Sequence, residues 1–181
     1  FPKGIDHNAI DLDFSLKKNL SNLADSKNKK FENLRICVLD RPRHKKIIDE
    51  AKSLNIHVKL ISDGDVSGAL LVTDEKYNID LFLGTGGGPE GVLAASALDS
   101  YGCGFQGRFI FDTDILKKRA NKMGINNFDK KYKINEIVKG DSLFCATGIT
   151  KGDLVNGLEL KDNKMVVNTL ITHKSQNTKK L

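Results

Sequence analysis

The sequence predicts an α/β fold in which successive strand–loop–helix units form a layered, mostly parallel sheet. Three short apolar segments have strand character, at 35–39, 57–61 and 79–83. Each is followed by a polar or glycine-rich loop and then by a segment with the apolar spacing of a helix. Strands that alternate with helices pair in parallel and are covered on both faces, so their residues are almost continuously apolar.

The elements can be assigned in chain order from these patterns. Ser15 is a suitable N-cap for an amphipathic helix that carries Leu16, Leu20 and Leu23. Beyond the three strands, the further predicted elements are a helix ending near Asn55, helices over 66–72, 92–98 and 114–123, and strands over 108–111, 143–147 and 165–171. Residues 175–181 are expected to fray.

Composition and charge indicate a single cytoplasmic domain without a membrane or nucleic-acid partner. The 181 residues carry a net charge of +6, and the lysines are scattered without a nucleic-acid motif. No apolar run approaches the roughly 20 residues of a membrane-spanning helix. Cys37, Cys103 and Cys145 lack metal-binding spacing, so we expect reduced, buried thiols. His44 and His57 also lack a partner at metal-ligand spacing and are interpreted as structural or surface residues.

The most informative segment is the glycine run 84–91, Gly-Thr-Gly-Gly-Gly-Pro-Glu-Gly. It joins a strand to a helix, so its free N–H groups and missing side chains favour an anion such as phosphate. Glu90 would repel a phosphate unless a cation lay between them, which predicts phosphate together with a divalent metal. A purely structural tight turn is the alternative.

Two other loops carry charged pairs at strand ends. Arg41-Pro42-Arg43 follows the first strand, and paired guanidinium groups bind phosphate through charge-assisted hydrogen bonds. Asp63-Gly64-Asp65 follows the second strand and suits sugar hydroxyls or a cation. The alternatives are a surface turn with incidental arginines and a helix-capping Asp65. Because the carboxyl ends of parallel strands share one edge, both pairs and Glu90 are expected along one rim.

These loops occur in a fixed order together with weaker matches elsewhere. The segments are 38–44, 60–66 and 84–92, with further similarity at 2–4, 11–13, 106–108 and 146–152. Together they resemble the class II fructose-1,6-bisphosphatases, metal-dependent sugar bisphosphatases of the lithium-sensitive phosphatase superfamily. The resemblance covers nearly the whole chain. It implies the C-terminal half of a larger αβαβα sandwich, with 1–30 a connecting segment from a missing N-terminal half and 31–181 an α/β substrate-binding domain.

The resemblance also implies a role for individual residues. These roles are substrate binding by Arg41, Pro42, Arg43, Asp63, Gly64, Asp65 and, through its backbone, Gly87, and binding of Mn²⁺ or Mg²⁺ by Glu90. The family's other metal carboxylates and its catalytic threonine region lie in the missing half. No catalytic residue is therefore assigned within this chain.

The implied reaction is hydrolysis of the 1-phosphate of fructose 1,6-bisphosphate to fructose 6-phosphate, in gluconeogenesis and in carbohydrate and glycerol metabolism. Two alternatives stay open: a haloacid-dehalogenase-type phosphatase with Asp63 as covalent nucleophile, and a non-enzymatic nucleotide- or phosphate-binding domain. We expect the isolated chain to be inactive. We also expect a homo-oligomer, because the surface that the missing half covers would be exposed.

Overall fold

The computed structural model describes residues 1–180, and a parallel sheet forms the centre of its N-terminal part. The strand order is β2-β1-β3. β1 (Arg35–Leu39) pairs in parallel with β2 (His57–Ile61) along its whole length and with β3 (Leu81–Phe82) over two residues. The predicted parallel α/β arrangement is confirmed, although β3 is shorter than the apolar run 79–83 indicated.

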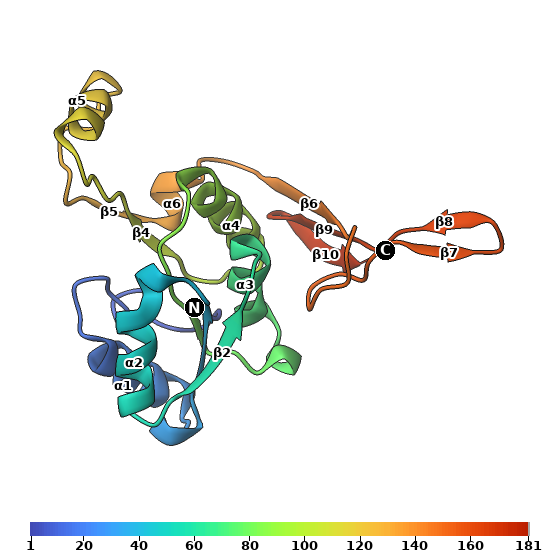
Figure 1. Ribbon diagram of the computed structural model, residues 1–181, viewed down its shortest axis with the longest axis horizontal. Coiled ribbons are helices and arrows are strands. Elements are labelled where there is room, and N and C mark those ends of the chain that lie inside the picture. The colour runs from blue at the N-terminus through green and yellow to red at the C-terminus, as the bar shows by residue number, and fades with distance from the viewer. Residues whose placement is uncertain (181) are drawn as a thin grey trace.

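Helices cover both faces of this sheet (Figure 1). They are α1 (Leu16–Lys27), α2 (Lys45–Ser53), α3 (Asp65–Leu70) and α4 (Gly88–Ser100), with 3-10 turns η1 (Phe31–Asn33), η2 (Pro42–His44), η3 (Leu71–Thr73) and η4 (Glu75–Tyr77). Ser15 caps α1 as predicted, because its side chain accepts a hydrogen bond from the N–H of Lys18. α4 begins four residues before the predicted helix 92–98, so the end of the glycine run is its first turn.

Two hydrophobic clusters hold the helices against the sheet. On one face, Ile36 and Val38 of β1 belong to a cluster with residues of α1 and α2. On the other face, Cys37 belongs to a cluster with residues of α3 and α4. β1 thus contributes to both clusters, which is why its sequence is continuously apolar rather than alternating.

The C-terminal part adds a second, antiparallel sheet of order β10-β9-β6. Its strands are β6 (Leu143–Thr147), β9 (Thr169–His173) and β10 (Gln176–Lys180), and Phe144 and Leu170 join the cluster under α4. The prediction that 175–181 frays was wrong for 176–180, whose backbone pairs with β9. Leu181 lies outside the described residues.

The predicted strand 165–171 is divided in the structure. Its first part is β8 (Lys164–Val166), which pairs with β7 (Glu159–Lys161), and its second part is β9. The break occurs at Asn168, whose backbone oxygen accepts from the N–H of Gly148 and whose Oδ1 accepts from the N–H of Asn156. Asn168 therefore fastens the loop between β6 and β7 instead of continuing a strand.

Two ribbons project from the body of the molecule (Figure 1). One is β7–β8; the other is formed by β4 (Gln106–Arg108) and β5 (Lys131–Lys133), with α5 (Asp114–Lys122) beyond it and α6 (Ile134–Ile137) after it. The predicted strand 108–111 was wrong except at Arg108, because the strand lies at 106–108 and Phe109 and Phe111 enter an aromatic cluster with Tyr132 and Phe128.

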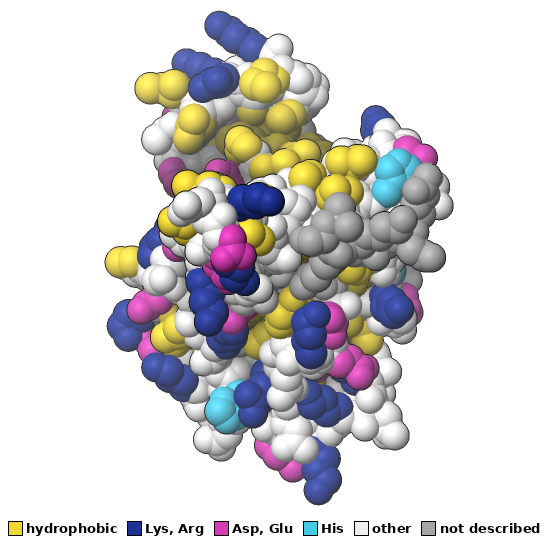
Figure 2. All heavy atoms as spheres, turned by 90° about the vertical axis from the view of Figure 1, so that its right-hand side faces the viewer, with side chains coloured by type: hydrophobic (Ala, Val, Ile, Leu, Met, Phe, Trp, Pro, Cys, Tyr) yellow, Lys and Arg dark blue, Asp and Glu magenta, His cyan; other side chains and the backbone are white. Residues whose placement is uncertain are grey.

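The surface and the thiols agree only in part with the sequence analysis. Lys and Arg side chains are spread over the face in Figure 2, with hydrophobic side chains mainly in its upper half. All three cysteines are free, and Cys37 and Cys103 are buried. Cys145 is exposed, so its predicted burial was wrong: it lies on the outward face of β6. No helix within residues 1–180 is long and apolar enough to cross a membrane.

Candidate functional site

The three loops singled out from the sequence follow β1, β2 and β3 at the same edge of the parallel sheet. The loop after β1 touches the glycine run, because Arg43 Nε donates to the backbone oxygen of Thr85 at 2.6 Å. The loop after β2 touches it as well, since a Cβ atom added to Gly86 would lie 3.3 Å from the Asp65 carboxylate. The expected meeting of the loops along one rim is therefore present in the structure.

The arginine pair is held on a stiff turn. Pro42 opens the 3-10 turn η2, where its fixed φ fits the first helical position. Arg41 is half-buried and donates from Nη1 to the backbone oxygen of Asp40 at 3.0 Å. Arg43 is exposed, and among residues 1–180 only its Nε has a hydrogen-bond partner. The outer edge of the Arg43 guanidinium is thus available to a ligand.

The aspartate pair flanks a glycine that the backbone requires. Gly64 has φ +86°, and a Cβ atom there would lie 2.4 Å from Ser67 Oγ. Asp63 Oδ1 accepts from the N–H of Gly64 at 2.9 Å. The alternative that Asp65 caps a helix was wrong, because Gly64 is the N-cap and Asp65 is the first residue of α3. The half-buried Asp65 carboxylate instead faces the glycine run.

The glycine run ends as the first turn of α4, with Gly87 as N-cap and Pro89 and Glu90 in that turn. A Cβ atom on Gly87 would lie 2.0 Å from Glu90 Oε2, so the carboxylate folds back over Gly87 and leaves no room for a side chain. Glu90 is exposed, and it has no hydrogen-bond or ion-pair partner in the part of the chain that the structure describes. Unpaired N–H groups and one carboxylate therefore share this helix start.

The described residues do not form a complete metal site. Within residues 1–180, no group of three or more His, Cys, Asp or Glu side chains is arranged to hold a metal ion. A divalent cation such as Mg²⁺ takes about six oxygen ligands, and Glu90 supplies at most two of them.

Sequence reasoning missed how His44 is used. The imidazole is fully buried between the end of β1 and the glycine run. Its Nδ1 lies 2.8 Å from the backbone oxygen of Leu39, and its Nε2 lies 2.8 Å from the backbone nitrogen of Thr85. Its place directly after the arginine pair was the only sequence signal.

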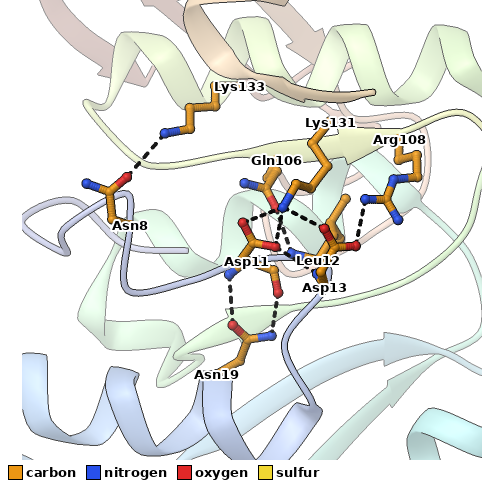
Figure 3. Close-up of polar contacts among 9 residues, drawn as sticks. All are labelled: Asn8, Asp11, Leu12, Asp13, Asn19, Gln106, Arg108, Lys131 and Lys133. Atoms are coloured by element: carbon orange, nitrogen blue, oxygen red, sulfur yellow. Dashed lines mark hydrogen bonds and ion pairs between the residues drawn. The ribbon is translucent and has the colours of Figure 1, made fainter. Parts of the chain in front are cut away.

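A second missed feature is a polar network that joins the N-terminal segment to the β4–β5 ribbon (Figure 3). Lys131 Nζ lies 2.5 Å from Asp11 Oδ1 and 2.7 Å from Asp13 Oδ2, and Arg108 donates to Asp13. The hydrogen bonds from Lys131 lower the pKa of both carboxyl groups, with Arg108 also lowering that of Asp13. The same bonds raise the pKa of Lys131.

The network fixes the ribbon next to the candidate site. Gln106 Oε1 accepts from the N–H of Leu12 at 2.6 Å, which adds a further tie. Phe109, directly after β4, lies 3.6 Å from the position of a Cβ atom on Gly88 at the start of α4. The glycine run is thus bordered by the arginine turn on one side and by this ribbon on the other.

Comparison with known proteins adds to this geometry. The family model described as "Bacterial fructose-1,6-bisphosphatase, glpX-encoded" matches residues 2–181. The chain belongs to this family. The resemblance of its three loops to class II fructose-1,6-bisphosphatases is therefore confirmed, and residues 41–43, 63–65 and 84–91 all lie within the matched region.

Curated relatives of this fructose-1,6-bisphosphatase family carry the name "D-fructose 1,6-bisphosphatase class 2/sedoheptulose 1,7-bisphosphatase". The protein from Synechocystis sp. is 36% identical over 182 aligned residues, which cover 93% of this chain and 53% of the relative. The protein from Microcystis aeruginosa is 39% identical over 162 residues, which cover 82% of this chain and 47% of the relative. The chain spans about half the length of these relatives.

Proposed function

We propose that the chain is the substrate-binding part of an enzyme that hydrolyses the 1-phosphate of fructose 1,6-bisphosphate, yielding fructose 6-phosphate and phosphate. The observation that carries the proposal is the convergence of one basic and one acidic loop on a glycine-rich helix start, in a chain of this family. The names of the relatives support the substrate class. Those names also make sedoheptulose 1,7-bisphosphate a second candidate substrate.

In this proposal the arginine turn binds the phosphate that does not react. Arg43 keeps Nε on Thr85 and offers its outer edge, while Arg41 adds a second positive charge. Pro42 stiffens the turn, which lowers the entropy that the arginines lose on binding. The N–H groups around Gly87 add backbone donors at the start of α4.

The acidic loop binds the sugar. Carboxylates are acceptors only, so Asp63 and Asp65 suit hydroxyl groups, which can donate. Gly64 keeps the two side chains apart on a turn that no other residue adopts without strain. A sugar held between this loop and the arginine turn would lie over the glycine run.

A divalent metal completes the proposed site, with Glu90 as one of its ligands and the others outside residues 1–180. When bound, the metal would neutralise charge on the transferring phosphoryl group and activate water. We propose Mn²⁺ or Mg²⁺, a cytoplasmic location, a homo-oligomer and a role in gluconeogenesis and glycerol metabolism. Among residues 1–180 no contact favours the alternatives of an Asp63 nucleophile or a nucleotide-binding domain, whereas family membership favours the bisphosphatase.

The test is a calorimetric titration of the chain with fructose 1,6-bisphosphate, compared with fructose 6-phosphate and fructose. Binding should be strongest for the bisphosphate and undetectable for fructose, because the arginine turn recognises phosphate. Lys46→Ala, a change on the exposed side of α2, serves as control and should leave binding unchanged. Equal binding of all three sugars, or no binding of the bisphosphate at millimolar concentration, would contradict the proposal.

A further inference from the structure

His44 occupies the place of a hydrogen bond in the parallel sheet. Leu83 N donates to the backbone oxygen of Cys37 at 3.1 Å, which is the last ladder bond between β1 and the strand that leads to the glycine run. Two residues further along both segments, the next bond of a parallel ladder would join the N–H of Thr85 to the oxygen of Leu39. The structure has the His44 imidazole between these two groups instead.

The partners of the ring define its tautomer. Leu39 offers a carbonyl oxygen, so Nδ1 must carry the proton that is donated to it. Thr85 presents two groups to Nε2, its N–H at 2.8 Å and its backbone oxygen at 3.1 Å. The contact with the N–H is the shorter, so we assign Nε2 as the acceptor, through its lone pair. Both nitrogen atoms of a fully buried imidazole are therefore satisfied, and both sheet groups that lost their direct bond are satisfied through it.

The ring also separates the two segments. A direct N–H···O bond would bring Thr85 N within about 3 Å of Leu39 O, whereas an imidazole ring and two bonds of 2.8 Å now separate them. Gly84 is part of this arrangement, because a Cβ atom there would lie 3.2 Å from His44 Cε1. The glycine run thus leaves the sheet at the point where the ring is inserted.

We propose that His44 is a positioning residue, whose imidazole holds the glycine run away from β1 and orients it to receive phosphate. This inference rests on the proposed function. Arg43 and His44 both contact the backbone of Thr85: Arg43 Nε donates to its oxygen at 2.6 Å, and His44 Nε2 accepts from its N–H at 2.8 Å. The turn that carries the phosphate-binding arginines therefore also sets the position of the loop opposite them, so the two halves of the phosphate site move together.

The geometry is tested by NMR on the labelled chain. We expect a proton on His44 Nδ1 and a scalar coupling across the hydrogen bond between the Thr85 amide nitrogen and His44 Nε2. A proton on Nε2, or a Thr85 amide that exchanges freely with solvent, would overturn the inference. This measurement needs no ligand, so it decides about His44 even if the chain does not bind sugar phosphate and the proposed function fails.

The functional part is tested by titrating variants with fructose 1,6-bisphosphate. His44→Phe keeps a ring but removes both bonds, and we expect about tenfold weaker binding, in line with the loss of the buried hydrogen bond to Thr85 that orients the loop. In His44→Gln the glutamine side chain is long enough to place its Oε1 near the position of Nε2, where it can accept from Thr85 N. In His44→Asn the shorter asparagine side chain can place its NH₂ group near Nδ1 and donate to Leu39 without reaching Thr85. The glutamine variant should therefore bind more tightly than the asparagine variant. His57→Phe, at the opposite edge of the sheet, is the matched control and should bind like the parent.

Parent-like binding by folded His44→Phe would overturn the positioning role. If His44→Phe does not fold, the relative affinities of His44→Gln and His44→Asn for fructose 1,6-bisphosphate test the positioning role instead. Equal or tighter binding by the asparagine variant would show that the bond to Thr85 does not orient the loop. Circular dichroism and thermal unfolding of each variant establish that the folded state is compared.

Discussion

The guanidinium group of Arg43 has two roles: one nitrogen binds the backbone of the fold, and the others are available to the proposed ligand. Its Nε is used by Thr85, which leaves the terminal nitrogens for a phosphate. The three N–H donors of lysine radiate from one nitrogen atom, so they do not span Thr85 and a phosphate as the planar guanidinium does. The same residue therefore fixes the loop geometry and contributes to affinity, so its replacement should affect binding more than the loss of one surface charge would.

We predict that Arg43→Ala weakens binding of fructose 1,6-bisphosphate by about 1.5–3 kcal/mol, the usual contribution of hydrogen bonds to charged groups. Arg43→Lys should lie between the parent and the alanine variant. Calorimetry measures both constants, with Lys46→Ala as the charge-matched control. Unchanged binding by a folded Arg43→Ala would remove this residue from the substrate site.

Glu90, like Arg43, has polar atoms that are available to a ligand. Its carboxylate has no partner among residues 1–180 and lies over Gly87. We predict that Mn²⁺, a paramagnetic ion, broadens the NMR signals of residues 87–90 and that Glu90→Gln, which removes charge but keeps size, reduces this broadening. The test compares both chains at equal Mn²⁺ concentration. If the two titrations coincide, Glu90 acts only as a helix-start acid in the field of the helix dipole.

Among the elements, the N-terminal segment and the β4–β5 ribbon depend on each other through charge. Asp11 and Asp13 have lowered pKa values and Lys131 has a raised one, chiefly through their mutual hydrogen bonds. The carboxylate contribution to stability is present above their ordinary pKa of 3.8 and is lost as the pH falls through the lower folded values. The lysine contribution is present below 10.5 and is lost as the pH rises through its higher folded value.

We therefore predict that Lys131→Met lowers the free energy of unfolding at neutral pH. At strongly acid and at strongly alkaline pH the effect of this substitution should be smaller. The gap between parent and variant should narrow as the pH falls below 3.8 and as it rises above 10.5, because one side of the network is progressively neutralised in each direction. Urea unfolding followed by circular dichroism across the pH range measures the gap. A gap that stays constant with pH would mean that Lys131 stabilises the ribbon by packing of its aliphatic stem.

The elements differ in how far their sequence determines them. The strand 35–39 could be predicted because burial on both faces leaves a continuous apolar pattern in the chain itself. The break at Asn168 could not, since it depends on hydrogen bonds to Gly148 and Asn156. Similarly, the bond between His44 and Thr85 joins residues 41 positions apart, and that between Asp11 and Lys131 joins residues 120 apart. The site loops were predictable as motifs, whereas the contacts that hold them were not.

At the scale of the whole molecule, the groups proposed to bind substrate all lie along one rim of the parallel sheet. Arginines, aspartates and loop N–H groups lie along one rim, and no metal cluster completes the rim within the described residues. We predict that the chain of 181 residues releases no phosphate from fructose 1,6-bisphosphate above background, even with Mn²⁺, because phosphoryl transfer requires metal ions held in fixed geometry. A phosphate-release assay decides this. Turnover abolished by Arg43→Ala would show that the active site is complete here.

The three thiols of the folded chain are chemically unequal. Burial raises the pKa of Cys37 to about 11, and burial likewise raises the pKa of Cys103. Since the thiolate is the reactive form, a maleimide at neutral pH should modify the exposed Cys145 alone, and all three cysteines once urea unfolds the chain. Mass spectrometry counts the adducts, and rapid modification of Cys37 in the native state would contradict this. The natural sequence thus provides a single attachment point for a fluorophore on β6, which would report on the C-terminal sheet without any engineered cysteine.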